Sequence, residues 1–111
     1  MVAAAAVAVL LGGDGFLRRA KRYQREAELH AAEERWYRGL PTRPEALAER
    51  LDATSSTIRL EFSEFQVSGR WDGAIPLIRK LIIYHTQLRQ KYERAASHPW
   101  MSVDPDPPPP F

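Results

Sequence analysis

The sequence predicts an all-α protein with two long antiparallel helices, a short connecting helix, an apolar N-terminal segment and an extended Pro-rich tail. Two stretches of good helix formers, residues 16–38 and 74–97, contain no proline beyond a first turn. Both carry apolar residues three and four positions apart, which is the spacing of one helix face. No pair of alternating segments that would form a sheet is found between them. We therefore expect a helical domain over residues 18–97.

Length and composition limit the classes of function. The chain has 111 residues and a net charge of +2, so it is long enough for one domain, and its bulk charge names no partner. It contains no cysteine, which excludes disulfides, thiolate nucleophiles and cysteine-ligated metal sites. No cofactor is expected.

Residues 1–17 form an apolar N-terminal segment that begins MVAAAAVAVLLGG. A membrane-spanning helix needs about 20 residues. The apolar run approaches that length only if it includes the charged Asp14 and continues to Leu17. We interpret Val2–Leu17 as a possible single membrane anchor, which predicts membrane-associated localisation. An interfacial or signal-like segment, or a buried or disordered end of a cytoplasmic protein, are the alternatives.

A basic cluster follows the apolar segment directly. Because it adjoins an apolar run, contact with lipid headgroups or another anionic surface is the favoured interpretation. A solvated helix face and a weak nucleic-acid site are the alternatives, and interleaved aromatic residues are few. The cluster consists of Arg18, Arg19, Lys21, Arg22 and Arg25.

The first long helix is predicted to start after Asp14, a suitable N-cap, and to end at Gly39 in the left-handed conformation. Its candidate core stripe consists of Phe16, Ala20, Tyr23, Ala27 and Ala31.

The connecting region begins with a capping-box pattern, Thr42 to Glu45, with Pro44 in the first turn of a short helix that extends to about Ala53. Residues 54–71 fit both helical and strand spacing, and we expect helix or irregular structure there.

The second long helix is predicted to be capped by Asp72 and stopped by Pro99. Its apolar stripe is expected to be buried against the alanine-rich stripe of the first helix, because the two have matching periods. The stripe consists of Leu77, Leu81, Tyr84 and Leu88.

The histidines are the only candidates for acid–base or metal chemistry. Antiparallel long helices would bring His30 and His85 to one layer, close to Glu26, Glu33 or Glu34. The Glu-x-x-His and His-x-x-x-His spacings of metal-binding helices are missing, however, and Ser55 and Ser56 have no associated base. We assign no catalytic, cofactor-binding or metal-binding residue, and expect neither enzymatic activity nor a small-molecule substrate.

Residues 98–111 form a Pro-rich tail that is expected to be extended. In one interpretation, Pro99 and Trp100 cover an apolar gap between the helices. Trp100→Ala would then cost about 1–3 kcal/mol, whereas deletion of 104–111 would leave folding nearly unchanged. In the other, Pro107 and Pro108 belong to a peptide that a protein partner binds.

The C-terminal third resembles a set of short, uncharacterised bacterial proteins with an N-terminal apolar anchor and a YHxxLxxKYERAAxxPWxxVxPDPP motif. The residues that carry the resemblance run from Tyr84 and His85 through 91–96, Pro99 and Trp100 to 105–108. Met101 and the final Pro109, Pro110 and Phe111 depart from the pattern. The resemblance implies no reaction, ligand or partner.

These observations favour a small membrane-associated helical interaction protein that contacts a bilayer or its surface. A soluble helical adaptor that presents its Pro-rich tail, and a weak nucleic-acid-binding protein, are the alternatives.

Overall fold

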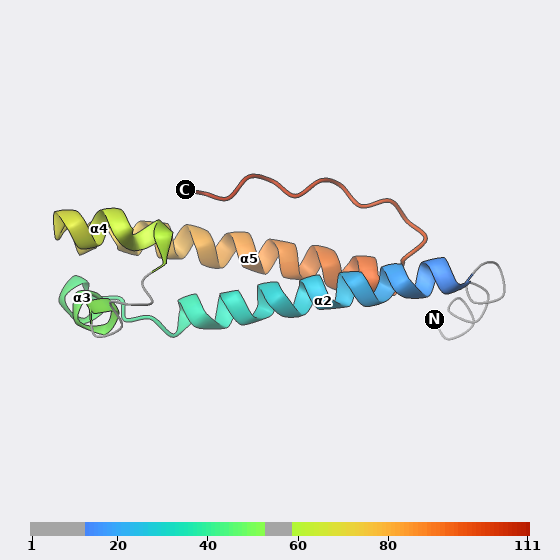
Figure 1. Cartoon of the computed structure of the whole chain (residues 1–111), viewed down its shortest axis with the longest axis horizontal. Helices are drawn as coiled ribbons and strands as arrows, with labels where there is room; N and C mark the ends of the chain where they lie inside the picture. Colours follow the sequence, from blue (N-terminus) through green and yellow to red (C-terminus); the bar gives the residue numbers. More distant parts are fainter. Residues whose placement is uncertain (1–12, 53–58) are drawn as a thin grey trace. The chain divides into compact units, whose positions relative to one another are not determined.

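The computed structural model describes residues 13–52 and 59–111, and within these ranges every regular element is helical, so the all-α class is confirmed (Figure 1). Most of the predicted anchor, together with Ser55 and Ser56, lies outside the described residues. The elements are α2 Gly13–Arg38, α3 Pro44–Asp52, η2 Leu60–Phe62, α4 Ser63–Ser68, η3 Trp71–Gly73 and α5 Ala74–Ser97.

The described residues pack as two units. The first unit contains residues 13–32 of α2 together with residues 85–107, which comprise the second half of α5 and the start of the tail. The second unit contains residues 33–52, 59–84 and 108–111. Each long helix therefore contributes one part to each unit.

In the first unit α2 and α5 run antiparallel, as predicted. Tyr23 of α2 lies against Tyr92 of α5, with ring centroids 5.9 Å apart. About two turns further along α2, His30 lies against His85, with ring centroids 5.1 Å apart. Residue numbers thus rise along one helix as they fall along the other. The buried apolar side chains of this seam are Tyr23, Ala27, Leu88 and Ala95.

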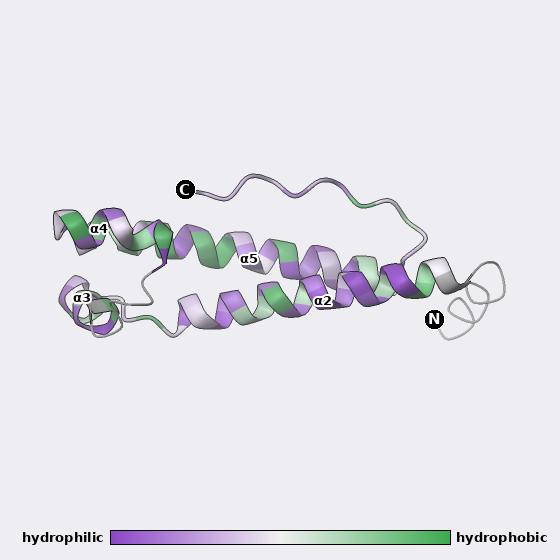
Figure 2. Ribbon diagram, viewed as in Figure 1, coloured by the Kyte–Doolittle hydropathy of each residue, from purple (hydrophilic) through white to green (hydrophobic). Residues whose placement is uncertain are grey.

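The second unit contains the main apolar core. Phe62, Leu47 and Leu81 are almost completely inaccessible to solvent. In Figure 2, α4 and the first half of α5 carry broad hydrophobic bands, whereas the N-terminal half of α2 is mostly hydrophilic. The core is formed by Tyr37, Leu40, Leu47, Leu51, Phe62, Trp71, Ala74, Ile78 and Leu81, with Ala48, Phe65, Ile75, Leu77 and Ile82 packed against it.

Two details of this core differ from the sequence prediction. Leu81 and the partly buried Leu77 pack into the cluster that contains α3, η2 and η3, a set of neighbours that the matched stripes of the long helices did not indicate. Trp71, which belongs to a segment predicted only as a turn, is 6% exposed and is part of the core. An aromatic side chain in a short 3-10 turn has no periodic neighbours, so helical spacing does not reveal its burial.

The helix ends follow the predicted boundaries closely, but one turn was assigned wrongly. α2 ends at Arg38 as expected, yet Gly39 does not have a positive φ, because its N–H donates to the carbonyl of Arg35 and continues the helical turn. The left-handed glycine among the described residues is Gly69, with φ of 70°, and it terminates α4. Among residues 13–52 and 59–111, only Gly69 uses glycine's tolerance for positive φ.

The segment 54–71, expected to be helical or irregular, is helical from Leu60 to Ser68, where η2 and α4 lie. These elements place Phe62 and Phe65 toward the core and leave Leu60 and Val67 exposed. Burial therefore follows the i, i+3 spacing of the two phenylalanines and not the alternation of Leu60 with Phe62.

Candidate functional site

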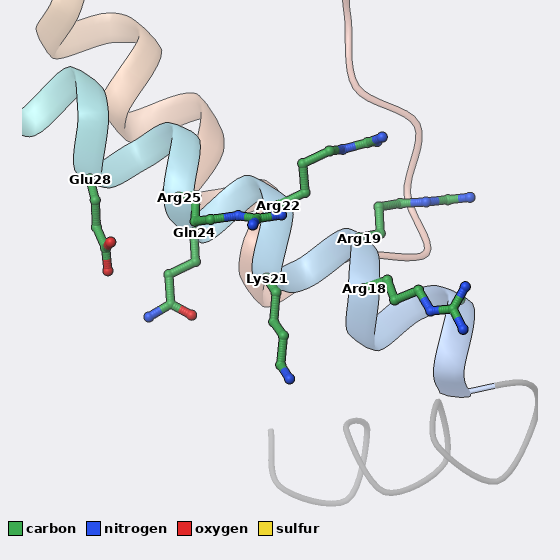
Figure 3. A pocket seen from close by; sticks show the side chains of 8 residues that line it. Arg18, Arg19, Lys21, Arg22, Gln24, Arg25 and Glu28 are labelled. Atoms are coloured by element: carbon green, nitrogen blue, oxygen red, sulfur yellow. The ribbon is translucent and has the colours of Figure 1, made fainter.

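The basic cluster occupies the solvent-facing surface of the N-terminal part of α2, in the first unit. All five of its cationic residues are exposed. At 3.6 residues per turn, Arg18, Lys21, Arg22 and Arg25 fall within an arc of about 100°, with Arg19 beside them. Figure 3 shows these side chains extending away from the helix in several directions. Together with Gly15, Gln24 and Glu28 they line an open hollow. We call this surface the basic face.

Neighbouring groups hold two members of the basic face. The Arg19 guanidinium donates to the carbonyl of Pro99 over 3.2 Å and lies 5.8 Å from the ring of Phe16. The Arg22 guanidinium lies 5.3 Å from the ring of Tyr23, a cation–π distance. Arg19 therefore forms a hydrogen bond within the unit, and Arg22 rests against an aromatic ring. All five side chains remain exposed to solvent.

A histidine pair connects the two helices of the first unit. The Nδ1 atoms of His30 and His85 lie 2.8 Å apart, a hydrogen-bond distance. One ring must donate and the other accept, so this contact cannot persist when both rings are fully protonated. On its other side, His30 Nε2 lies 4.0 Å from a carboxylate oxygen of Glu26. The predicted meeting of His30 and His85 is confirmed, with Glu26 as the adjacent acid.

The tail is anchored next to the histidine pair. Asp106 Oδ1 accepts hydrogen bonds from Lys91 Nζ over 2.8 Å and from the Tyr92 hydroxyl over 2.6 Å. Lys91 Nζ also donates to the backbone carbonyl of Asp104. The ring of Tyr92 stacks nearly parallel to His30, at an interplanar angle of 5°. We call these contacts of Lys91 and Tyr92 the tail anchor.

The ionisation of the tail anchor follows from these contacts. Partial burial alone would raise the pKa of Asp106, but the hydrogen bonds from Lys91 and Tyr92 outweigh it and bring the pKa below its usual value. Burial, followed by the hydrogen bond to Asp106, raises the pKa of Tyr92. At neutral pH the site therefore pairs an ionised carboxylate with a protonated phenol and an ammonium group.

Pro99 and Trp100, the residues predicted to pack the tail, behave differently from one another. Pro99 is buried, as expected. Trp100 is 41% exposed, and its ring meets His98 edge-on at 5.4 Å. The ring of Trp100 is therefore less buried than the packing interpretation predicted, and the polar contacts of Asp106 also hold the tail. Pro107 and Pro108, the predicted partner contacts, are exposed.

A second polar cluster, in the second unit, surrounds Arg59. Its guanidinium lies 3.9 Å from the centroid of the Trp36 ring and forms an ion pair with Glu33. It also donates to the Tyr37 hydroxyl over 3.3 Å, and that hydroxyl donates to Glu61. Burial alone would lower the pKa of Arg59, but the hydrogen bonds to Glu33 and Tyr37 outweigh it, and the pKa lies above its usual value. Burial and the hydrogen bond to Glu61 raise the pKa of Tyr37. Sequence spacing gave no indication of this cluster, because its residues come from separate elements.

The structure adds no support for a metal site or a membrane span among the described residues. Within 13–52 and 59–111, no three histidine, cysteine, aspartate or glutamate side chains gather as metal ligands. In the same ranges no helix combines the length and apolar character that crossing a bilayer requires. Comparison with family models, curated proteins and solved structures finds no match to this chain.

Proposed function

We propose that this chain is a small helical protein that associates with anionic membrane surfaces through its basic face, and that it acts by interaction and not by catalysis. The observation that carries the proposal is the display of the basic face. Five cationic side chains within eight consecutive residues are all exposed, and four share one arc of α2.

The position of the basic face in the sequence supports a membrane in preference to other anionic surfaces. The uncharged run Val2–Gly13 is separated from Arg18 by four residues, and cationic residues close to an apolar segment lie at the level of lipid phosphates. In this proposal Val2–Leu17 enters the bilayer and the arginines remain at the headgroups. Each cation near an anionic surface contributes about 1 kcal/mol.

Co-flotation of the full chain with lipid vesicles tests the proposal. Vesicles of phosphatidylcholine alone are compared with vesicles that also contain phosphatidylserine. We expect stronger binding to the anionic vesicles, with the difference decreasing as salt screens the charges. Removing two charges with Arg18→Gln and Arg22→Gln should weaken anionic-vesicle binding by roughly thirtyfold, at about 1 kcal/mol per charge.

A matched control comes from α5. Arg79 and Lys80 are also exposed and adjacent on a helix, but they lie outside the basic face. Replacing both with glutamine removes the same charge and should change binding little. Equal losses for the two double variants would show that only net charge matters, and would refute a role for the basic face. Binding to single-stranded DNA without preference for anionic vesicles would identify a nucleic-acid-binding protein instead.

A further inference from the structure

The tail anchor binds two groups of the tail, a backbone carbonyl and a carboxylate. Lys91 contacts both the carboxylate of Asp106 and the backbone carbonyl of Asp104, while Tyr92 contacts the carboxylate alone. The two contacted groups belong to residues two positions apart, and Pro105 lies between them. The contacts thus define a short pattern, a carbonyl followed two residues later by a carboxylate.

The sequence of the tail fixes this pattern before it docks. Pro105 has a restricted φ, and a residue that precedes a proline is pushed into extended conformations. Asp104 and Asp106 both precede prolines. Asp-Pro-Asp-Pro is therefore extended in the unbound state, and it loses little conformational entropy when it binds.

The receiving side chains are positioned independently of the tail. The Tyr92 ring is held between Tyr23 and His30, with both centroid distances at 5.9 Å. The Lys91 ammonium lies 5.3 Å from the Tyr92 ring, a cation–π distance. Because these contacts do not involve the tail, we expect them to remain when the tail leaves.

The docked tail is attached by polar contacts and is not packed into a core. Residues 104–107 are exposed. A hollow remains beneath the tail, lined on the helix side by Arg22, Tyr23, Glu26 and Tyr92. Attachment by a few hydrogen bonds at an exposed site is weak enough to permit exchange.

We propose that Lys91 and Tyr92 form a recognition site for acidic proline-rich peptides of the type Asp-Pro-Asp-Pro. The chain's own residues 104–107 fill this site, and the same sequence supplied by another molecule exchanges with them. The tether makes the tail an intramolecular competitor at an effective concentration on the order of millimolar. Lys91 and Tyr92 are not members of the basic face, so this proposal does not depend on membrane binding.

Nuclear magnetic resonance titration with a synthetic peptide of residues 102–111 tests the proposal. The receptor is the full chain carrying Asp106→Ala, whose own tail lacks the carboxylate. We expect the peptide to shift the backbone amide resonances of Lys91 and Tyr92, and to bind the wild-type chain at least tenfold more weakly. Equal affinity for both chains, or no binding to Asp106→Ala, would overturn the proposal.

Three controls sharpen the result. A peptide that carries the same Asp106→Ala change should not bind, and adding Tyr92→Phe to the receptor should weaken binding, whereas adding Tyr84→Phe on the same helix should not. Circular dichroism checks that each receptor is folded. An independent measurement on the wild-type chain is the order parameter of the Asp104 and Asp106 amides. Values below about 0.6, typical of flexible backbone, would also refute a docked tail.

Discussion

The two units use the same helices but are stabilised by different interactions. In the second unit, Phe62, Leu47 and Leu81 are sealed from solvent within a large apolar cluster. In the first unit, the seam between α2 and α5 buries fewer and mostly smaller apolar side chains, and adds contacts between tyrosine and histidine rings and the hydrogen bond between His30 and His85. An apolar core is weakened by the loss of buried volume, whereas a hydrogen-bonded pair is weakened by the loss of either partner. The units should therefore respond to different perturbations.

The largest expected effect is loss of the aromatic centre of the second unit. Phe62 is completely buried, so Phe62→Ala removes its packing and leaves a cavity. We expect it to lower the free energy of unfolding by about 3–5 kcal/mol. Urea denaturation followed by circular dichroism measures the total effect, and hydrogen exchange of α3 and α4 locates it.

Leu60 provides the matched control for Phe62. It lies two residues away in the same 3-10 helix and is 89% exposed. Leu60→Ala should change stability by less than about 0.5 kcal/mol. A similar loss for both variants would show that the second unit lacks the apolar core described here.

The next effect is smaller and should affect the first unit selectively. His85→Leu removes the hydrogen bond between the Nδ1 atoms of His30 and His85 and keeps a side chain of similar size at the seam. We expect the free energy of unfolding to fall by about 1 kcal/mol, the usual contribution of one hydrogen bond.

Hydrogen exchange of the variant and the wild-type chain locates this loss in the molecule. Protection should decrease for residues 20–30 and 85–95 and remain unchanged for α3. A decrease spread equally over both units would contradict a local role for the histidine pair.

The tail anchor should persist at mildly acidic pH. The pKa of Asp106 is lowered in the folded chain, so its contribution is present above the usual aspartate pKa of about 4 and is lost as pH falls through the lower folded value. Tail release, measured by the amide resonances of Asp104 and Asp106, should therefore require a pH below about 4. Release of the tail near neutral pH would contradict this prediction.

The smallest effect is expected at Trp100. Its ring is 41% exposed, so Trp100→Ala should change the free energy of unfolding by less than about 0.5 kcal/mol. Thermal melts of the two chains measure the difference. A loss above 1 kcal/mol would show that the ring packs against the helices, as the sequence alone had suggested.

Sequence reasoning predicted the elements of this fold because they depend on local chemistry. Helix formers, turn residues and Pro99 set the limits of α2 and α5 nearly to the residue. The partners of each helix face could not be obtained in this way, since Leu81 packs with Leu47 and Trp71 through turns whose geometry no periodicity encodes. The wrong assignment of a left-handed conformation to Gly39 has a similar cause, because glycine permits that conformation but does not require it.

Of the two candidate sites, the sequence predicted the basic face but not the tail anchor. The basic face is a run in the sequence, so its five residues were found directly. The tail anchor joins Asp106 to Lys91 and Tyr92 across a chain reversal, and that contact depends on how the tail leaves α5. The sequence favoured burial of Trp100 because its ring is large. The residue that attaches the tail is instead Asp106, a carboxylate flanked by prolines.

The hydrogen bond between His30 and His85 also assigns a chemical identity to each ring. Since the facing atoms are both Nδ1, the two neutral imidazoles must be different tautomers. His30 Nε2 faces Glu26, which favours a proton on that nitrogen and leaves His30 Nδ1 as the acceptor. His85 then carries its proton on Nδ1. The ring nitrogens of the two histidines should give opposite patterns of chemical shift, so a nitrogen-15 spectrum can report the contact between the helices without any mutation.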